Sequence, residues 1–413
     1  MDWSHRAFGN SGTVCPLTRI PSFYCDYLPT LTMELFVYGS IGDIPRDEWD
    51  RWFGSDYPFL GYDFLLGLET ADCTTVKSGW APFHLVLREG GVAIGAAPGF
   101  LKEHSYGEYV FDWAWADAWH RQGLEYYPKL ISAAPFTPAT GPRLWTDPNR
   151  SDALGEFSRA VMALCEEKGI TGWHILFADN YPAQEELPGD DFVERVTCQF
   201  HWINRGYSDF EDFLQTFSSR KRKNLRKERA SIAQQGLSLC TFRGDAITSA
   251  HWQFFHHCYQ TTYAKRSGHG GYLTKAFFLE VCPALGDIPV MVIAEDEAGL
   301  PVAAALYFES SHTLFGRYWG CLREYDNLHF EACYYRGIEY CIQRGLQRFD
   351  PGAQGEHKIQ RGFEPTLTRS LHWVAEPGFR EPIAAFCRRE KDQVRAYQQE
   401  ASSLLPFKNM AGE

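Results

Sequence analysis

Hydrophobic and polar residues alternate along this chain with two different periods, which predicts both helices and strands. Between residues 151 and 168, apolar side chains recur at every third or fourth position and Gly169 follows, as expected for an amphipathic helix that ends at a glycine. Residues 84–87 and 92–96 are short apolar runs on either side of Glu89-Gly90-Gly91, which predicts a β-hairpin. The pattern therefore predicts a mixed α/β (α+β) fold.

The predicted elements form two series of similar order. In the first half the predicted strands are 34–40, 84–87, 92–96 and 173–177. A helix is predicted to start at 45–49, and two further helices are predicted at 62–70 and 151–168. In the second half they are strands at 192–203, 290–294, 302–308, 313–319 and 371–374 and helices at 209–235, 251–265, 273–281 and 330–344. We therefore predict a structural duplication without a residue-level repeat. A polar link near 185–195 would separate a first domain at 34–190 from a second at 191–413, which ends in a helix.

Residues 1–33 differ from the rest of the chain. They have no hydrophobic period, are rich in Pro, Ser, Thr and Gly, and lack the basic start and apolar core of a signal peptide. We predict a disordered N-terminal arm, with Met33 as an alternative start. Elsewhere no apolar stretch approaches the ~20 residues that a membrane span requires.

The composition excludes some classes of function but does not identify the function. A formal net charge of −12 argues against a surface made for general nucleic-acid or anionic-membrane binding, so any polyanion site must be local. The 12 cysteines include no CxxC pair and no tight Cys/His cluster, so we expect no metal site. Reduced thiols in a chain of 413 residues are the simplest account and suggest a cytoplasmic protein.

The run 351–365 carries the greatest variety of polar groups, between three glycines and two prolines. These groups belong to Gln354, Glu356, His357, Lys358 and Arg361. The glycines and prolines predict a loop, or a loop that leads into a strand, and catalytic groups are common in loops. Glu356 or His357 could accept a proton from an attacking amine, while Lys358 and Arg361 could hold a phosphate or carboxylate. An intramolecular ion-pair network is the alternative.

The start of the predicted helix 330–344 is a second candidate. Its spacing buries Cys333 and Tyr334, places Glu331 on a different side and leaves His329 in the first turn. A helix start that follows a strand and a loop offers free N–H groups to an anion or oxyanion. Glu331 could serve as a base. The alternative for His329 and Glu331 is an exposed polar face with an ordinary cap.

Two basic segments stand out in this acidic chain. Residues 220–229 form a predicted helical run with seven basic residues, Arg222 and Arg226 among them, and this run could bind the phosphates of a nucleic acid or cofactor. A solvated helix face is the alternative. The Gly-rich basic loop 265–271 follows a helix rather than a strand, so dinucleotide-binding and P-loop interpretations fail.

Acidic and aromatic residues alternate in the segment 102–117. Its candidate polar groups are His104, Glu108, Asp112 and Asp117. Together with the neighbouring aromatic rings they suit a pocket for a cationic or amine-bearing acceptor. They also suit a buried, hydrogen-bonded aromatic core.

Several strings in the chain occur in the same order in one known family. They are Gly79-Trp80, 102–117, Tyr126-Tyr127-Pro128-Lys129-Leu130, Pro135-Phe136-Thr137-Pro138, Gly141-Pro142-Arg143 and 352–365. With these strings the chain resembles the FemAB-like family of predicted bacterial N-acyltransferases, from residue 34 to the C-terminus. The resemblance implies tandem GNAT-like domains, each a mixed sheet flanked by helices, with a cleft between them.

The resemblance also implies a choice of acyl donor. The better-known Fem relatives move an amino acid from aminoacyl-tRNA to an amine of a peptidoglycan precursor, whereas ordinary GNAT enzymes use acyl-CoA. The basic run 220–229 would suit tRNA. This chain lacks the Gln/Arg-x-x-Gly-x-Gly/Ala loop before the helix at 329, so the usual place for the CoA pyrophosphate is in doubt. The long coiled-coil arm of some Fem relatives is not evident.

Together these features predict an N-acyltransferase that moves an acyl or aminoacyl group to a primary amine by direct attack. No Ser or Cys elbow is recognisable, which fits a reaction without an enzyme nucleophile. The expected base is Glu356 or His357, then Glu331, with the oxyanion held near His329 or by Lys358. Donor-binding residues would be Gln354, Lys358, Arg361, Arg317, Arg222 and Arg226, and acceptor-binding residues His104, Glu108, Asp112 and Asp117.

No tightly bound cofactor is expected, because acyl-CoA or aminoacyl-tRNA would be a substrate. The expected acceptor is a small molecule or the amine of a peptidoglycan precursor. Two other functions remain open at this point. One is a non-catalytic cell-wall or peptide-binding module on the same fold, and the other is an RNA-binding protein that uses residues 220–229.

Overall fold

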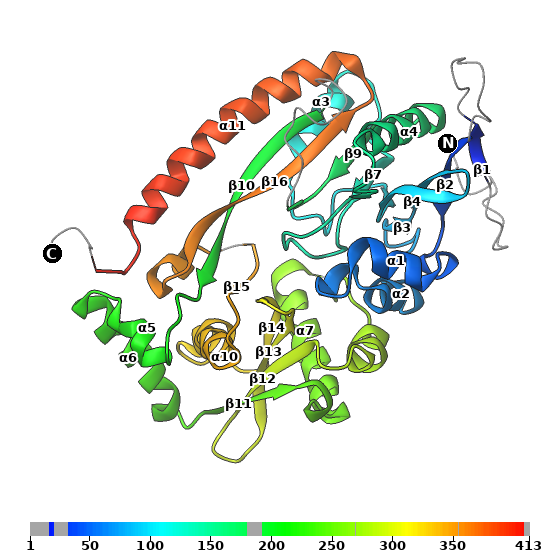
Figure 1. Ribbon diagram of the computed structural model, residues 1–413. Helices are drawn as coiled ribbons and strands as arrows, with labels where there is room; N and C mark the ends of the chain where they lie inside the picture. The colour runs from blue at the N-terminus through cyan, green and yellow to red at the C-terminus, as the bar shows by residue number, and fades with distance from the viewer. Residues whose placement is uncertain (1–15, 20–31, 180–191, 269, 354, 409–413) are drawn as a thin grey trace.

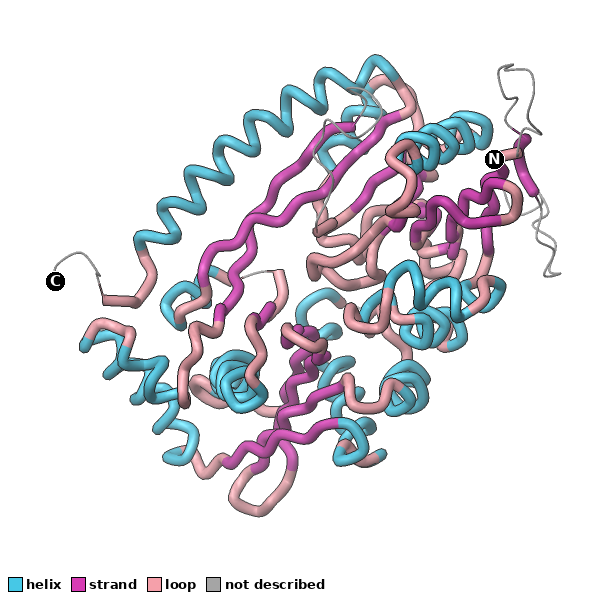
Figure 2. Tube along the Cα trace, viewed as in Figure 1, coloured by secondary structure: helices cyan, strands magenta, loops and turns pink. Residues whose placement is uncertain are grey.

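Two β-sheets with helices on their faces organise the part of the chain that the structure describes. The structure is a computed structural model, and it describes residues 16–19, 32–179, 192–268, 270–353 and 355–408. Within these ranges one sheet has 5 strands and the other has 11 (Figures 1 and 2). The predicted mixed α+β class is confirmed.

The described elements have the following bounds. The strands are β1 (Pro16–Arg19), β2 (Met33–Tyr38), β3 (Ala81–Pro82), β4 (His84–Glu89), β5 (Val92–Ala97), β6 (Phe100–Lys102), β7 (Lys129–Ser132), β8 (Trp145–Thr146), β9 (Gly172–Ile175), β10 (Phe192–Ile203), β11 (Ser238–Arg243), β12 (Pro289–Glu295), β13 (Pro301–Glu309), β14 (Thr313–Cys321), β15 (Arg348–Asp350) and β16 (Glu364–Val374). The α-helices are α1 (Arg46–Phe53), α2 (Tyr62–Thr70), α3 (Trp113–Arg121), α4 (Ala153–Lys168), α5 (Phe210–Gln215), α6 (Ser219–Gln234), α7 (Ser249–Ser267), α8 (Cys282–Ala284), α9 (Leu328–Phe330), α10 (Arg336–Arg344) and α11 (Pro377–Ser403). Short 3-10 helices are η2 (Ile41–Asp43), η3 (Pro58–Leu60), η6 (Gly244–Ala246) and η9 (Glu356–Arg361), and π-helical turns are η7 (Phe277–Val281) and η8 (Glu331–Tyr335).

The larger sheet runs through both halves of the chain. Its order is β11-β12-β13-β14-β15-β10-β16-β9-β7-β6-β3. The long antiparallel pair β10–β16 connects the two sides, because β10 also pairs with β15 and β16 also pairs with β9. Helix α11 lies along this pair (Figure 1). The division into domains at 34–190 and 191–413 remains a prediction, and strand β16 of the second half extends the sheet of the first.

Local sequence signals account for many of the element ends. Helix α4 ends at Gly169, which adopts φ 66°, a left-handed conformation that glycine reaches without a Cβ penalty. Helix α7 begins with a capping box, in which the Thr248 hydroxyl accepts from the His251 backbone N–H and the His251 side chain accepts from the Thr248 backbone. Strand β10 has the predicted bounds, 192–203.

Tertiary contacts change three of the predicted elements. The helix predicted at 209–235 is broken between α5 and α6, because the Ser218 N–H donates to the Pro406 carbonyl at 2.9 Å and Phe217 pairs with Phe407 of the C-terminal segment. The helix predicted at 330–344 contains the π-helical turn η8. The run 351–365, predicted as a loop, contains η9 and then enters β16.

The N-terminal segment differs from the prediction at one place. Residues 16–19 of the predicted disordered arm 1–33 form β1, which pairs with β2 at the edge of the smaller sheet. Residues 1–15 and 20–31 lie outside the described residues.

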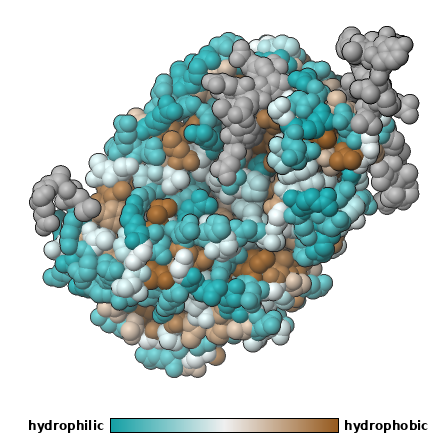
Figure 3. Space-filling model, viewed as in Figure 1, coloured by the Kyte–Doolittle hydropathy of each residue, from teal (hydrophilic) through white to brown (hydrophobic). Residues whose placement is uncertain are grey.

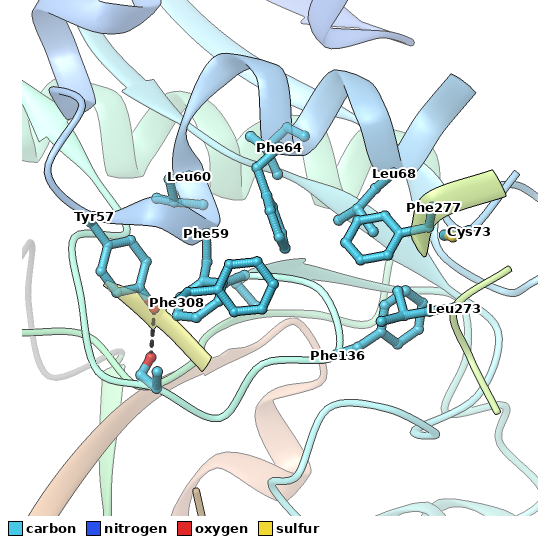
Figure 4. Packing of buried hydrophobic residues seen from close by; sticks show 14 of the residues in the cluster. Tyr57, Phe59, Leu60, Phe64, Leu68, Cys73, Phe136, Leu273, Phe277 and Phe308 are labelled. Atoms are coloured by element: carbon cyan, nitrogen blue, oxygen red, sulfur yellow. Dashed lines mark hydrogen bonds between the residues drawn. The ribbon is translucent and has the colours of Figure 1, made fainter. Parts of the chain in front are cut away.

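The two halves of the chain share one aromatic core. Figure 4 shows Phe59 and Phe64 of the first half packed against Phe308 and Phe277 of the second. The ring centroids of Phe59 and Phe308 are 5.4 Å apart, and those of Phe64 and Phe277 are 5.7 Å apart. Tyr57 also closes this core, since its hydroxyl donates to the Ala139 carbonyl at 2.8 Å. Buried aromatic rings contribute strongly to core packing, so this cluster joins the two halves through a common core.

The face of the molecule that Figure 3 shows is mainly hydrophilic, as expected for a chain with 22% charged residues. Figure 3 shows a largely teal face that is interrupted by small hydrophobic areas. No helix in the described ranges is both long and apolar enough to cross a bilayer.

Candidate functional site

A cavity of about 410 Å³ lies where β14 separates from β15. The two strands pair in parallel over residues 313–315 and 348–350, and residues 316–319 of β14 then line the cavity. Arg317 lies at a β-bulge, because Leu306 of β13 pairs with Tyr318 while Tyr307 pairs with Gly316. The bulge and the separation of the strands open space inside the sheet.

Both halves of the chain line the cavity. Helix α7 supplies Tyr263 and Arg266, and the helical segment 328–335 supplies His329, Cys333 and Tyr334. Tyr109 is the described lining residue that comes from the first half. The site therefore lies between the halves, as the predicted cleft requires.

The cavity is lined by positive charge without negative charge. Arg266 and Arg317 both line it, and none of the described lining residues is an aspartate or glutamate. Arg317 Nη2 donates to the Phe136 carbonyl at 2.8 Å, and its buried Nε has no hydrogen-bond partner among the described residues. A guanidinium with a free donor in a partly enclosed site suits a carboxylate or phosphate.

Three titratable side chains of the cavity, those of His329, Cys333 and Tyr334, are held in their neutral forms. Burial, with the charge of nearby Arg266 and of His357 in addition, lowers the pKa of His329 to about 3, so its imidazole is neutral at pH 7. Burial raises the pKa of the Cys333 thiol, which therefore stays protonated and is a poor nucleophile. Burial also raises the pKa of Tyr334, whose hydroxyl lies 2.8 Å from His357 Nε2.

The run 351–365 folds back beside the start of the helix at 328. The ring centroids of His329 and His357 are 6.0 Å apart, and the Arg361 guanidinium lies 3.4 Å from the Phe330 ring centroid. Partial desolvation of the His357 ring, together with the Arg361 and Lys358 charges, lowers its pKa to about 4. His357 reaches the cavity through its contact with Tyr334.

Other members of this run form an internal network. Lys358 is buried, its Nζ donates to the Gly352 carbonyl at 2.6 Å, and burial lowers its pKa to about 8. Arg361 donates to Glu228 at 2.9 Å. Glu356 is exposed and accepts from the Tyr397 hydroxyl at 2.7 Å. These contacts match the ion-pair alternative, and Lys358, Arg361 and Glu356 do not line the cavity. Gln354 lies outside the described residues.

Glu331 is tied up in a buried ion pair. Its Oε1 and Oε2 accept from Arg229 Nη2 and Nε at 2.8 and 3.0 Å, and Arg336 lies 3.2 Å away. Both carboxylate oxygens are therefore engaged, so this residue is poorly placed to act as the base. Arg222 and Arg226 lie on α6 outside the cavity, where Arg222 donates to Gln215 and Arg226 pairs with Glu211.

The predicted acceptor residues are not brought together in the cavity. Glu108 and Asp112 are buried and both accept from Lys129 Nζ, the first at 2.8 Å. His104 is half-buried, and its Nδ1 accepts from the Tyr106 N–H at 3.3 Å. Asp117 is exposed on α3. The alternative of a buried, hydrogen-bonded aromatic core therefore describes Glu108 and Asp112 better.

The cavity also contains residues that sequence reasoning did not select. Tyr109 follows Glu108 in the aromatic segment 102–117, and Arg266 belongs to the Gly-rich basic loop that was set aside. Tyr334 was assigned to the buried face of its helix. Each lay in a segment that had been noticed, but no local pattern indicates that three distant segments meet at the end of β14.

Metal and thiol chemistry add little to this site. In the described ranges no group of three or more His, Cys, Asp or Glu side chains could hold a metal ion. The ten cysteines that the structure describes are all free thiols.

Solved structures resemble this fold at low sequence identity. A conserved protein of unknown function from Bacteroides thetaiotaomicron is 12% identical, with a TM-score of 0.50 over 82% of this chain and 99% of that one. FemX is 11% identical, with a TM-score of 0.47 over 75% of this chain and 92% of its own. L-PGS from Bacillus licheniformis is 9% identical, with a TM-score of 0.46 over 83% of this chain and 96% of its own. At such identities the likeness concerns the fold alone. The curated proteins contain no sequence match.

A family profile matches the chain over most of its length. The profile is that of FemAB-like proteins, described as peptidoglycan biosynthesis/recognition, and it matches residues 40–409. The match confirms the resemblance seen in the sequence and the expected enzyme class, an acyltransferase. It supports transferase activity in peptidoglycan biosynthesis. The chain therefore belongs to the FemAB-like family.

Proposed function

We propose that this chain transfers an acyl or aminoacyl group to a primary amine in the cavity at the end of the β14–β15 pairing. One observation carries the proposal. The cavity combines Arg266 and Arg317 with the neutral His329 and the Tyr334–His357 pair, and no described lining residue is a carboxylate. This set of groups suits an anionic donor and a reaction that moves protons without a charged base.

The reaction would proceed by direct attack. The amine nitrogen attacks the carbonyl carbon of the donor ester or thioester, and the bond to the leaving oxygen or sulfur breaks as the tetrahedral intermediate collapses. The neutral His329 can accept a hydrogen bond from the amine and take its proton. Tyr334, hydrogen-bonded to His357 at 2.8 Å, can give a proton to the leaving group and regain one from the protonated His329, whose ring centroid lies 5.3 Å from its own. The net proton transfer is then from the amine to the leaving group, and both side chains return to their neutral forms. The guanidinium of Arg317 would stabilise the oxyanion or the donor anion.

This assignment revises the roles expected from the sequence. Glu356 contacts Tyr397 on the surface, and Glu331 is held by Arg229, so His329 and His357 remain as proton carriers. A covalent intermediate on Cys333 is disfavoured, because burial raises the pKa of its thiol. Direct attack follows from the absence of a better nucleophile among the described lining residues.

The donor would be acyl-CoA or aminoacyl-tRNA, and the acceptor a small amine or a peptidoglycan precursor, in the cytoplasm. The outer face of α6 favours an RNA donor, since Arg220, Lys223 and Lys227 are exposed there. The same face would serve the second candidate function, an RNA-binding protein. A non-catalytic cell-wall or peptide-binding module would bind its ligand in the cavity and would not need Tyr334 as a general acid.

A transfer assay with paired tyrosine variants tests the proposal. The purified chain receives isotope-labelled acyl-CoA or charged tRNA together with a cell extract, and mass spectrometry follows the label into amines. Tyr334→Phe should lower the rate about 100-fold, the loss expected for a general acid. Tyr397→Phe is the matched control, because it removes a hydroxyl that contacts Glu356 away from the cavity. Label from neither donor, or equal rates in both variants, would sink the proposal.

A further inference from the structure

The loop 103–112 between β6 and α3 forms the wall that the first half contributes to the cavity. Tyr106 and Phe111 of this loop are each 57% exposed, whereas Tyr109 lines the cavity and hydrogen-bonds with Tyr263 of α7. Tyr109 adopts φ 61° and Gly107 adopts φ 80°, both left-handed. For a tyrosine this conformation is strained, so other contacts must hold the loop in this shape.

A single buried lysine makes those contacts. Lys129 of β7 is completely buried, and an ammonium group has three N–H donors. Its Nζ donates to Ser105 Oγ at 2.8 Å, to Glu108 Oε2 at 2.8 Å and to Asp112 Oδ2. All three acceptors belong to the loop 103–112. The lysine therefore fixes the loop at its start, its middle and its end.

Neighbouring groups reinforce the same arrangement. The Tyr126 hydroxyl donates to Asp112 Oδ2 at 2.7 Å, and Lys102 Nζ donates to the Tyr106 carbonyl at 3.1 Å. Lys102 also lies 4.0 Å from the centroid of the Trp80 ring. The loop thus has a polar inner side that is bound by Lys102, Tyr126 and Lys129, and an outer side that carries the exposed rings of Tyr106 and Phe111.

The position of Glu108 explains how the cluster acts on the cavity. Tyr109 follows Glu108 directly, so a carboxylate held inward by Lys129 turns the next side chain toward α7 and β14. Glu108 and Asp112, which the sequence suggested as acceptor-binding residues, are buried and do not line the cavity. Their effect on a substrate would pass through Tyr109.

We propose that Lys129 is a positioning residue for the acyl-transfer site, and that by binding Ser105, Glu108 and Asp112 it presents Tyr109 as the wall against which the acceptor amine binds. The guanidiniums that suit an anionic donor come from α7 and β14, which leaves the Tyr109 wall for the acceptor. The role of Tyr109 toward the acceptor rests on the proposed function, whereas the hold of Lys129 on the loop does not.

Two substitutions separate the hold on the loop from the contact with substrate. Lys129→Met removes the three donors, and Tyr109→Asn removes the ring while keeping a residue that tolerates a left-handed conformation. Tyr106→Ala is the matched control, because this tyrosine is exposed in the same loop and does not line the cavity. If Lys129→Met does not fold, the triple variant Lys129→Met, Glu108→Gln, Asp112→Asn removes the buried charges together and replaces it.

Hydrogen–deuterium exchange of the substrate-free protein provides the first measurement. The lysine variant should exchange faster in the peptide that spans 103–112, while the other peptides and the Tyr109→Asn protein stay close to wild type. Faster exchange throughout the chain, or no change in this peptide, would overturn the hold of Lys129 on the loop.

Acceptor kinetics provide the second measurement. Both Lys129→Met and Tyr109→Asn should raise the KM for the acceptor about tenfold with little change in the KM for the donor, which is the pattern of lost acceptor binding. Tyr106→Ala should leave both constants unchanged. An unchanged acceptor KM in Tyr109→Asn would refute the acceptor wall. If wild-type protein transfers from neither donor, the proposed function fails, and the exchange data still decide whether Lys129 holds the loop.

Discussion

Replacement of Phe59 by alanine tests whether the two halves of the chain unfold as one unit. Phe59 lies in η3 of the first half and is 1% exposed. Its ring centroid lies 5.4 Å from that of Phe308 and 5.2 Å from that of Phe315, both in the second half, and 5.5 Å from that of Phe64. The substitution therefore opens a cavity in the core that the halves share.

The size of the effect follows from this packing. Removal of a fully buried phenylalanine side chain costs about 3–5 kcal/mol, including the cavity that it leaves. Each edge-to-face aromatic pair adds about 0.5–1.5 kcal/mol beyond the buried area. Because several such pairs are lost, we expect the upper end, about 4–5 kcal/mol. Phe111→Ala is the matched control, since its ring is 57% exposed and its loss should change stability by about 0.5 kcal/mol or less.

Urea unfolding followed by circular dichroism and by tryptophan fluorescence measures both the size and the cooperativity. A continuous sheet and a shared core predict one transition that both probes report and that Phe59→Ala shifts as a whole. Two separate transitions, of which the substitution moves one, would refute this coupling and favour independent domains at 34–190 and 191–413. A loss of less than about 1 kcal/mol would refute the packing argument itself.

Charged side chains give three further tests. Burial lowers the pKa of His174 to about 3, so the unfolded chain binds a proton at this imidazole more readily than the folded chain does. The free energy of unfolding should therefore fall as the pH drops from 6.5 toward 3. In urea titrations His174→Asn should make the free energy of unfolding depend less steeply on pH. Arg229→Met leaves Glu331 buried without its bidentate partner and should cost about 3–5 kcal/mol in thermal unfolding, much of it restored by adding Glu331→Gln. If α6 holds a tRNA donor, charge reversal of Arg222 and Arg226 should weaken RNA binding and its salt dependence in filter-binding assays, and unchanged affinity would remove these residues from the donor site.

Secondary structure could be predicted from the sequence wherever an element depends on the residues within it or directly beside it. The period of apolar residues and Gly169 define the end of α4, and the long apolar run 192–203 coincides with β10. The break between α5 and α6 could not be seen in the same way. It depends on Pro406 and Phe407, which lie far along the chain and contact residues 217–218 only after folding. The helical period continues through this break, so the sequence pattern alone favours one long helix.

The candidate site could be predicted as a region but not residue by residue. The resemblance and the polar run 351–365 led to the right neighbourhood, since this run lies beside His329. The roles of its charged members depend on partners from distant segments, such as Glu228 for Arg361, and sequence spacing does not show such pairs. Polar residues that attract attention in a sequence are also those that need a partner when buried.

This need for partners explains the charge of the cavity. Buried Glu331 is neutralised within the fold by Arg229, whereas the described lining residues of the cavity include Arg266 and Arg317 and no carboxylate. The whole chain carries −12, so at a distance it repels an anionic donor, and the guanidiniums attract only within about one Debye length, ~8–10 Å at physiological salt. Moderate salt should therefore screen the long-range repulsion more than the contact inside the cavity. An anionic donor that acts through this cavity should associate faster as salt rises from low levels, whereas a donor captured first by the basic face of α6 should associate more slowly.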